Sequence, residues 1–183
     1  MSITMRASSF AATMLAGLVA FSTGARAAAV ADSDQVSKIL SDVKMEAFQL
    51  REDADQLESF SRSSASWQSH ADAIEKIRQN VNAMGRLLAR LQEKRSGATP
   101  WEQTAIDRIS PIAKELAANT AAAIEHLKKN PERLNVAAYQ DYLEAVVDSA
   151  HNLSAMIGSF VDYGKTQQRL ERLSTRLEIP AAK

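Results

Sequence analysis

The side chains in this sequence that could do chemistry are few and scattered. Its 183 residues include three histidines and no cysteine, which excludes thiol nucleophiles, disulfides, cysteine-ligated zinc or iron–sulfur sites and covalent c-type haem. The most suggestive spacing is Asp148-Ser149-Ala150-His151, because helical di-metal proteins use a carboxylate and a histidine three residues apart. Those proteins need two such motifs, and this sequence has one. A solvated helix face is the preferred interpretation, and no metal site is predicted.

Methionine and histidine offer a second route to a cofactor. Met45, Met84, Met156 and His151 are the ligand types of a non-covalent b-type haem in a helical bundle. Methionine in an apolar helix seam more commonly fills space, so no cofactor is predicted. The sequence also lacks a glycine-rich phosphate loop, a His-Glu-x-x-His run and a Ser/His/Asp order, and we therefore expect a protein that is not an enzyme.

Charge and aromatic content argue against nucleic acid as a partner. The 22 Lys and Arg residues balance 22 Asp and Glu residues, and aromatic residues make up only 5% of the chain. Duplex nucleic acid requires a basic surface, and single strands require aromatic stacking platforms. We therefore expect no nucleic-acid partner.

Residues 1–29 have the pattern of a bacterial-type signal peptide. Arg6 precedes an apolar run, Phe10–Phe21, which is short for a membrane span. Small residues then permit cleavage after Ala27 or Ala29. Cleavage removes two arginines and leaves 20 basic against 22 acidic residues, a formal charge of −2. We expect a periplasmic protein with no transmembrane segment in the mature chain; an uncleaved anchor is the alternative.

Four segments repeat apolar residues at alternating intervals of three and four, which is typical of helices packed against near-parallel neighbours. The first is predicted over residues 33–61, and its seam consists of Val36, Leu40, Val43, Ala47, Leu50, Ala54 and Leu57. The others are predicted from Trp67 to a stop at Arg95–Ala98, from Pro100 to Lys129, and from about Asn135 to Leu177. No segment alternates with a period of two, so no strand is predicted.

Local signals and short joints define the expected architecture. Thr99-Pro100-Trp101-Glu102 matches a capping box with proline at the first helical position. Pro111 lies inside the same helix, but the seam keeps its phase across it, which predicts a kink and not a break. We expect an all-α, antiparallel up-down-up-down four-helix bundle over residues 30–164, with residues 165–183 extending the last helix.

Pairing antiparallel helices about their joints places Phe60, Trp67, Tyr139 and either His126 or Leu127 in one layer at an end of the bundle. The functional interpretation is a small ligand pocket, or a ligated cofactor, anchored by His126. The structural interpretation is a plug of wide side chains with the imidazole facing solvent. We favour the plug, because a lone histidine lacks the second ligand that most metal sites need.

Residues 117–123 form a run of small side chains within the third predicted helix. Small side chains let helix backbones approach closely, and tight packing is the favoured interpretation. The alternative is a void that a ligand could fill.

The last predicted helix outruns its three neighbours. Its end keeps a stripe of Leu170, Leu173 and Leu177 with no partner left inside the bundle. Four basic and two acidic residues give 165–178 a net charge of +2, which suits an acidic protein partner or an anionic membrane surface. The predicted binding residues are Lys165, Arg169, Leu170, Arg172, Leu173, Arg176 and Leu177. In the alternative, Gly164 is a hinge, and the segment bends back over the bundle end or packs on residues 30–35.

Together these features favour an exported, non-enzymatic helical bundle that binds a protein partner or its own copy. The second hypothesis is a carrier that holds haem, a metal or another ligand in the bundle interior.

Overall fold

The computed structural model describes residues 22–63 and 65–178, with side chains from Ser33 onward. This part of the chain is all-helical, as predicted, and contains no strand. Its elements are α1 (Ser22–Ser61), α2 (Trp67–Lys94), the short 3-10 helix η1 (Arg95–Gly97), α3 (Pro100–Lys129) and α4 (Ala137–Leu177). Most of the expected signal peptide, 1–29, lies outside the described residues.

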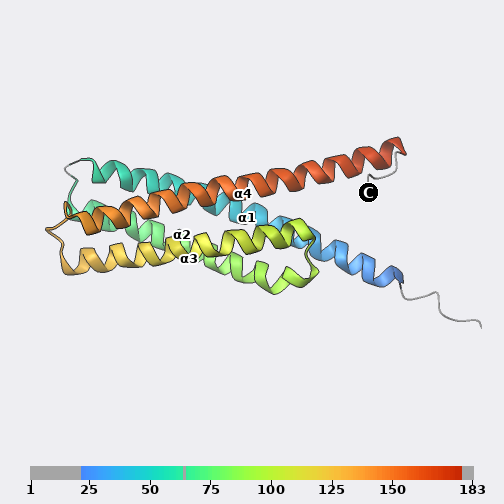
Figure 1. Ribbon diagram of the computed structural model, residues 1–183, viewed down its shortest axis with the longest axis horizontal. Helices are drawn as coiled ribbons and strands as arrows, with labels where there is room; N and C mark the ends of the chain where they lie inside the picture. Colours follow the sequence, from blue (N-terminus) through green and yellow to red (C-terminus); the bar gives the residue numbers. More distant parts are fainter. Residues whose placement is uncertain (1–21, 64, 179–183) are drawn as a thin grey trace, which may run out of the picture.

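The four long helices lie side by side along the long axis of the molecule (Figure 1). α1 packs against α2 and α4, and α3 packs against the same two helices, while α1 and α3 meet at few points. The connections after α1 and after α3 lie at one end, and the connection between α2 and α3 lies at the other. Each helix therefore has two close neighbours and one shared core.

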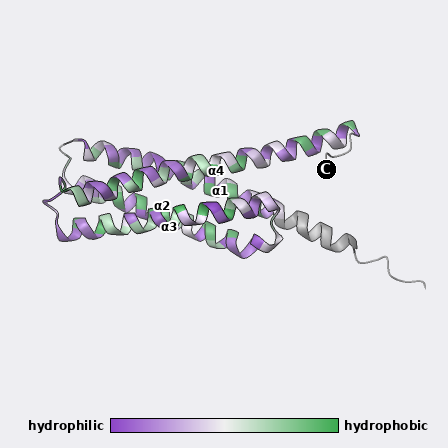
Figure 2. Cartoon of the chain, viewed as in Figure 1, coloured by the Kyte–Doolittle hydropathy of each residue, from purple (hydrophilic) through white to green (hydrophobic). Residues whose placement is uncertain are grey.

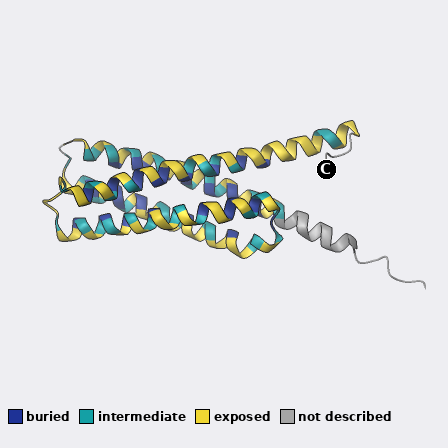
Figure 3. Cartoon of the chain, in the orientation of Figure 1, coloured by how far each residue is buried: buried dark blue, intermediate teal, exposed yellow. Residues whose placement is uncertain are grey.

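The seam predicted for the first helix lies wholly in the core. All seven seam residues of α1, from Val36 to Leu57, are at most 1% exposed. Buried residues follow the inward faces of the helices (Figure 3), and hydrophobic residues concentrate on the same faces (Figure 2). Burial of this apolar surface is the main favourable contribution to folding, and it fixes which face of each helix points inward.

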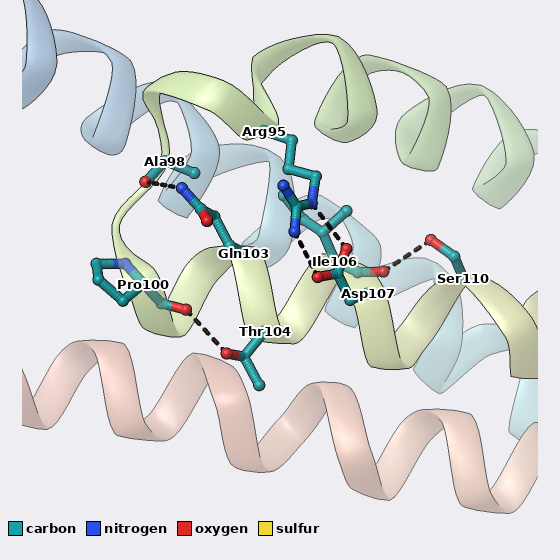
Figure 4. Close-up of polar contacts among 8 residues, drawn as sticks. All are labelled: Arg95, Ala98, Pro100, Gln103, Thr104, Ile106, Asp107 and Ser110. Atoms are coloured by element: carbon teal, nitrogen blue, oxygen red, sulfur yellow. Dashed lines mark hydrogen bonds and ion pairs between the residues drawn. The ribbon is translucent and has the colours of Figure 1, made fainter.

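The connection between α2 and α3 is held by polar contacts at both ends (Figure 4). The guanidinium of Arg95 donates two hydrogen bonds to the carboxylate of Asp107, at 2.7 and 2.6 Å. The amide of Gln103 donates to the carbonyl of Ala98 at 2.9 Å. These contacts hold the end of α2 against the first turns of α3.

The predicted capping box is confirmed, and its glutamate also contacts a second helix. The backbone N–H and the hydroxyl of Thr99 both donate to Glu102, at 2.8 and 2.7 Å. The same carboxylate is fully buried and accepts hydrogen bonds from Ser33 and Ser37 of α1. The start of α3 is thereby linked to α1.

The predicted continuity of the third helix is also confirmed. α3 runs through Pro111 without a break, and this proline is exposed. Directly before it, the hydroxyl of Ser110 donates to the carbonyl of Ile106, one turn earlier, at 2.7 Å (Figure 4).

Gly164 serves packing, and α4 continues through it as a regular helix to Leu177. A Cβ atom at this position would lie 2.6 Å from Cη2 of Trp101, closer than side chains tolerate. The alternative in which Gly164 acts as a hinge and the segment folds back is therefore wrong for this structure. The glycine is needed because the indole of Trp101 lies directly on the helix backbone.

The expectation that the last helix outruns three neighbours is wrong in one respect. α1 begins at Ser22 instead of about Ser33. Its first turns and the last turns of α4 both extend beyond the connection between α2 and α3, and they diverge from each other (Figure 1).

Two glycines of α4 provide a matched test of this packing. We expect Gly164→Ala to lower the melting temperature, because a clash costing about 1–3 kcal/mol exceeds the gain in helix propensity of about 1 kcal/mol. Gly158→Ala is expected to raise the melting temperature, since a Cβ atom there meets nothing within 4 Å. Thermal unfolding followed by circular dichroism checks both. Equal stabilisation by the two substitutions would contradict the packing role of Gly164.

Candidate functional site

An aromatic cluster closes the end of the bundle where α1 joins α2 and α3 joins α4. The hydroxyl of Tyr139 is 3.1 Å from Nδ1 of His70, and both side chains are buried. The ring of His126 stacks on Tyr139 with centroids 5.1 Å apart, and Phe60 lies 6.3 Å from His70. The structure thus brings Phe60, His126 and Tyr139 together as predicted, while Trp67 is 45% exposed.

His70 is the member of this cluster that the sequence analysis did not single out. It shares a helix face with Ile74 and Ile77, which are also buried. What the sequence could not give is its partner, because the pairing with Tyr139 depends on the relative register of α2 and α4. The sequence signal that could have identified His70 is an ionisable ring at a position that the helical spacing of apolar residues places in the core.

Burial controls the protonation of both partners. Desolvation lowers the pKa of His70 below its ordinary value of 6.5, and a backbone hydrogen bond with Phe60 acts in the opposite sense with smaller effect. Burial also raises the pKa of Tyr139. The pair is therefore neutral at pH 7, and its hydrogen bond satisfies two polar groups that would be costly to bury alone.

The contacts of this cluster are those that a plug of side chains would make. Its rings contact one another, and in the described part of the chain every buried side-chain nitrogen or oxygen has a hydrogen-bond partner. The ligand pocket anchored by His126 remains a prediction. Among residues 33–63 and 65–178, no group of three or more His, Asp or Glu side chains could hold a metal. His151 instead contacts Asp55 of α1 at 2.5 Å.

The predicted binding residues of α4 lie beyond the bundle. Leu170 and Leu177 are 57% and 58% exposed, and Leu173 is half-buried. The remaining members of the predicted set are exposed basic residues: Lys165, Arg169, Arg172 and Arg176. We refer to residues 165–178 as the α4 extension.

The apolar stripe of the α4 extension does not continue the buried seam. The seam residues Ile157, Val161 and Gly164 are followed, at helical intervals, by the polar residues Gln168, Glu171 and Thr175. Leu170 and Leu177 instead continue a neighbouring stripe of α4. That stripe consists of Met156, Phe160, Tyr163, Gln167, Leu170, Ser174 and Leu177. The sequence predicts the leucine stripe, but its phase relative to the core depends on how α4 packs against its neighbours.

The first part of this stripe lines a groove between α3 and α4. The groove has a volume of about 540 Å³, and Trp101, Phe160 and Tyr163 are among its walls. Trp101 and Tyr163 meet edge to face with ring centroids 5.7 Å apart. An apolar surface therefore runs from this aromatic groove onto the α4 extension.

A second groove lies between α2 and α3, and the sequence analysis did not find it. It has a volume of about 770 Å³ and includes Met84, Gly85 and Leu88 of α2 and Ala113 and Ala117 of α3. An isolated glycine in a helix interior, such as Gly85, is the sequence signal that could have marked it.

Comparison with known proteins adds no relative. No family model, no curated protein and no solved structure matches the chain. In the described residues, no helix has the length and apolar character needed to cross a bilayer.

The buried His70 predicts how stability depends on pH. Because its pKa is lower in the folded than in the unfolded state, the unfolded state binds the extra proton first as the pH falls below about 6.5. We expect the free energy of unfolding, measured with urea, to decrease from pH 7 to pH 5. His70→Gln is expected to weaken this dependence, whereas His126→Gln, at a half-buried ring that does not share the His70–Tyr139 hydrogen bond, retains it. An unchanged pH profile in His70→Gln would refute the assignment.

Proposed function

We propose that this chain is an exported, non-enzymatic helical protein that binds a protein partner, or a second copy of itself, through the α4 extension. The observation that carries the proposal is the exposure of Leu170 and Leu177 on a regular helix beyond the bundle. Leucines repeated at this spacing form an apolar stripe on one face of a helix. A partner that covers the stripe removes its apolar surface from water, which stabilises the complex.

The charge of the α4 extension supports an acidic partner. Its four basic residues are turned by roughly 90–150° around the helix axis from Leu170 and Leu177, at 3.6 residues per turn. A docked partner would cover the leucines and leave the basic residues at the rim, where charges speed association and select against basic competitors. An anionic membrane surface is the other occupant that this pattern fits.

The proposal includes the antiparallel up-down-up-down arrangement of residues 30–164, which would serve as a rigid base. Short joints favour this arrangement, and contacts between distant segments support it at both ends. His70 meets Tyr139 at one end, and Ser37 meets Glu102 at the other. A rigid base matters because a preorganised helix loses little conformational entropy when it binds.

Export rests on the sequence of residues 1–29, whose short apolar run and small-residue cleavage positions are those of a signal peptide. The periplasm is the compartment that this pattern favours.

The alternative is a carrier that holds haem, a metal or another ligand in the bundle interior. It has weaker support, because the rings at the end of the bundle contact one another and occupy the space that a ligand would need. Catalysis has weaker support still, since regular helices with short joints offer few loops on which a nucleophile could be mounted.

Removal of the α4 extension tests the binding role. We expect deletion of Lys165–Lys183 to leave a cooperatively melting bundle that has lost its oligomeric state or its co-purifying partner. The double substitution Leu170→Asp with Leu177→Asp should have the same effect, because it removes the apolar contact surface and keeps the helix. Sedimentation velocity on the exported protein, together with analysis of co-purifying chains, measures the outcome.

Met45→Asp is the matched control, since Met45 is an apolar residue of α1 that is 67% exposed and lies outside the α4 extension. Each of these surface substitutions should change stability by no more than about 0.5 kcal/mol. A truncated chain that does not fold, or full binding by the double variant, would require the binding role to be withdrawn.

The export proposal has its own test. The intact mass of protein recovered from the periplasm of an expressing bacterium should correspond to a chain that begins at Ala28 or Val30, because these follow the two permitted cleavage positions. A mass that retains Met1 would exclude the cleaved signal peptide.

A further inference from the structure

We propose that the groove between α2 and α3 binds a single-chain anionic amphiphile, with the alkyl chain along the groove and the anionic head at Arg86 and Lys114. This groove is separate from the α4 extension. Its volume of about 770 Å³ falls within the range of roughly 300–1,000 Å³ that is usual for small-molecule sites.

Apolar and small residues make up most of the lining of the groove, and Met84 and Leu116 are its most buried members. Val81, Met84 and Leu88 contribute the larger apolar side chains. Between Val81 and Gln92 the groove follows α2 for about 16 Å at 1.5 Å per residue. Its small residues are Gly85 and Ala89 of α2 and Ser110, Ala113 and Ala117 of α3. A partner helix packs by interlocking rows of side chains, and the small residues of this groove provide few such rows. An unbranched alkyl chain needs only a smooth trough.

Gly85 indicates that the chain itself does not fill this space. A Cβ atom at Gly85 would meet nothing within 4 Å, in contrast to Gly164, where Trp101 occupies the position. A glycine inside a helix costs about 1 kcal/mol relative to alanine, and at Gly85 no contact within the chain compensates for that cost. An occupant of the groove would use the space that the glycine leaves.

The charged residues that line the groove indicate which class of ligand it would bind. Arg86 of α2 and Lys114 of α3 line the groove from its two sides, and among the described residues no acidic side chain lines it. Both side chains are exposed, and neither forms an ion pair within residues 33–63 and 65–178. Two cations beside an apolar trough match a carboxylate or phosphate head on an alkyl chain, since Arg and Lys both bind such groups through charge-assisted hydrogen bonds.

Calorimetric titration of the full chain with laurate, below its micellar concentration and at fixed ionic strength, tests the proposal. We expect one laurate to bind per chain, and dodecyl phosphate to bind at the same site. Dodecyltrimethylammonium has the same alkyl chain and a cationic head, and it should bind at least tenfold more weakly. Whichever of laurate and dodecyl phosphate binds more tightly indicates whether a fatty acid or a phosphate-headed lipid is the source of the ligand.

Two matched pairs of variants locate the site. Gly85→Leu fills the groove and should weaken laurate binding at least tenfold, while Gly158→Leu makes the same change on α4, away from the groove, where the space is also open. Lys114→Gln should weaken laurate binding about fivefold, as expected for one partly exposed charge pair, and leave dodecyl maltoside unaffected. Arg90→Gln is its control, since Arg90 is an exposed residue of α2 that does not line the groove.

The proposal is overturned if laurate does not bind, if Gly85→Leu binds it normally, or if the cationic amphiphile binds equally well. It is also overturned if an acidic amphipathic peptide binds in place of laurate and is lost in Gly85→Leu, because the groove would then be a protein interface. Should Gly85→Leu fail to fold, Lys114→Gln retains the test, since it alters only an exposed side chain. Deletion of Lys165–Lys183 should leave laurate binding intact, so this proposal and the binding role of the α4 extension fail independently.

Discussion

The buried carboxylate of Glu102 is the polar contact on which the arrangement of this chain depends most. A carboxylate removed from water is strongly destabilising unless donors replace its hydration. Here the donors are Thr99, which begins the same helix, and Ser33 and Ser37, which lie on α1. Because α1 and α3 otherwise meet at few points, this contact ties together two helices that are not close neighbours. The position of α3 along the bundle is therefore coupled to the position of α1.

That coupling also decides where α4 leaves the bundle. Trp101 directly precedes Glu102, so fixing the carboxylate fixes the indole, which lies on the backbone of α4 at Gly164 and contacts Tyr163. Beyond this point the inward face of α4 changes from apolar to polar, at Gln168 and Glu171. The change in composition coincides with the end of α3 as a neighbour. Beyond it α1 still borders α4, where Asp34 lines a hollow with Gln168 and Arg172.

Properties that depend on neighbouring residues in one helix could be predicted from the sequence, and properties that depend on register between helices could not. The α1 seam and the capping box at Thr99 follow from spacing within a few turns, and both are confirmed. The pairing of His70 with Tyr139 depends on how far α2 and α4 slide past each other, which periodicity does not fix. Gly164 was open to interpretation as a hinge because glycine permits flexibility and close approach alike, and only the position of Trp101 distinguishes them. The groove at Gly85 was missed for the same reason, since it exists only once α2 and α3 are placed together.

The two apolar surfaces outside the core carry charge of the same sign, and this restricts what they can do together. The groove between α2 and α3 is lined by Arg86 and Lys114, and the α4 extension has a net charge of +2. Placing the extension of one copy in the groove of another would bring like charges together around an apolar contact, which disfavours that complex. Self-association through the extension would therefore use a surface other than the groove and leave the groove accessible. The proposed anionic ligand and the proposed partner would therefore not compete, because the groove and the α4 extension share no residues.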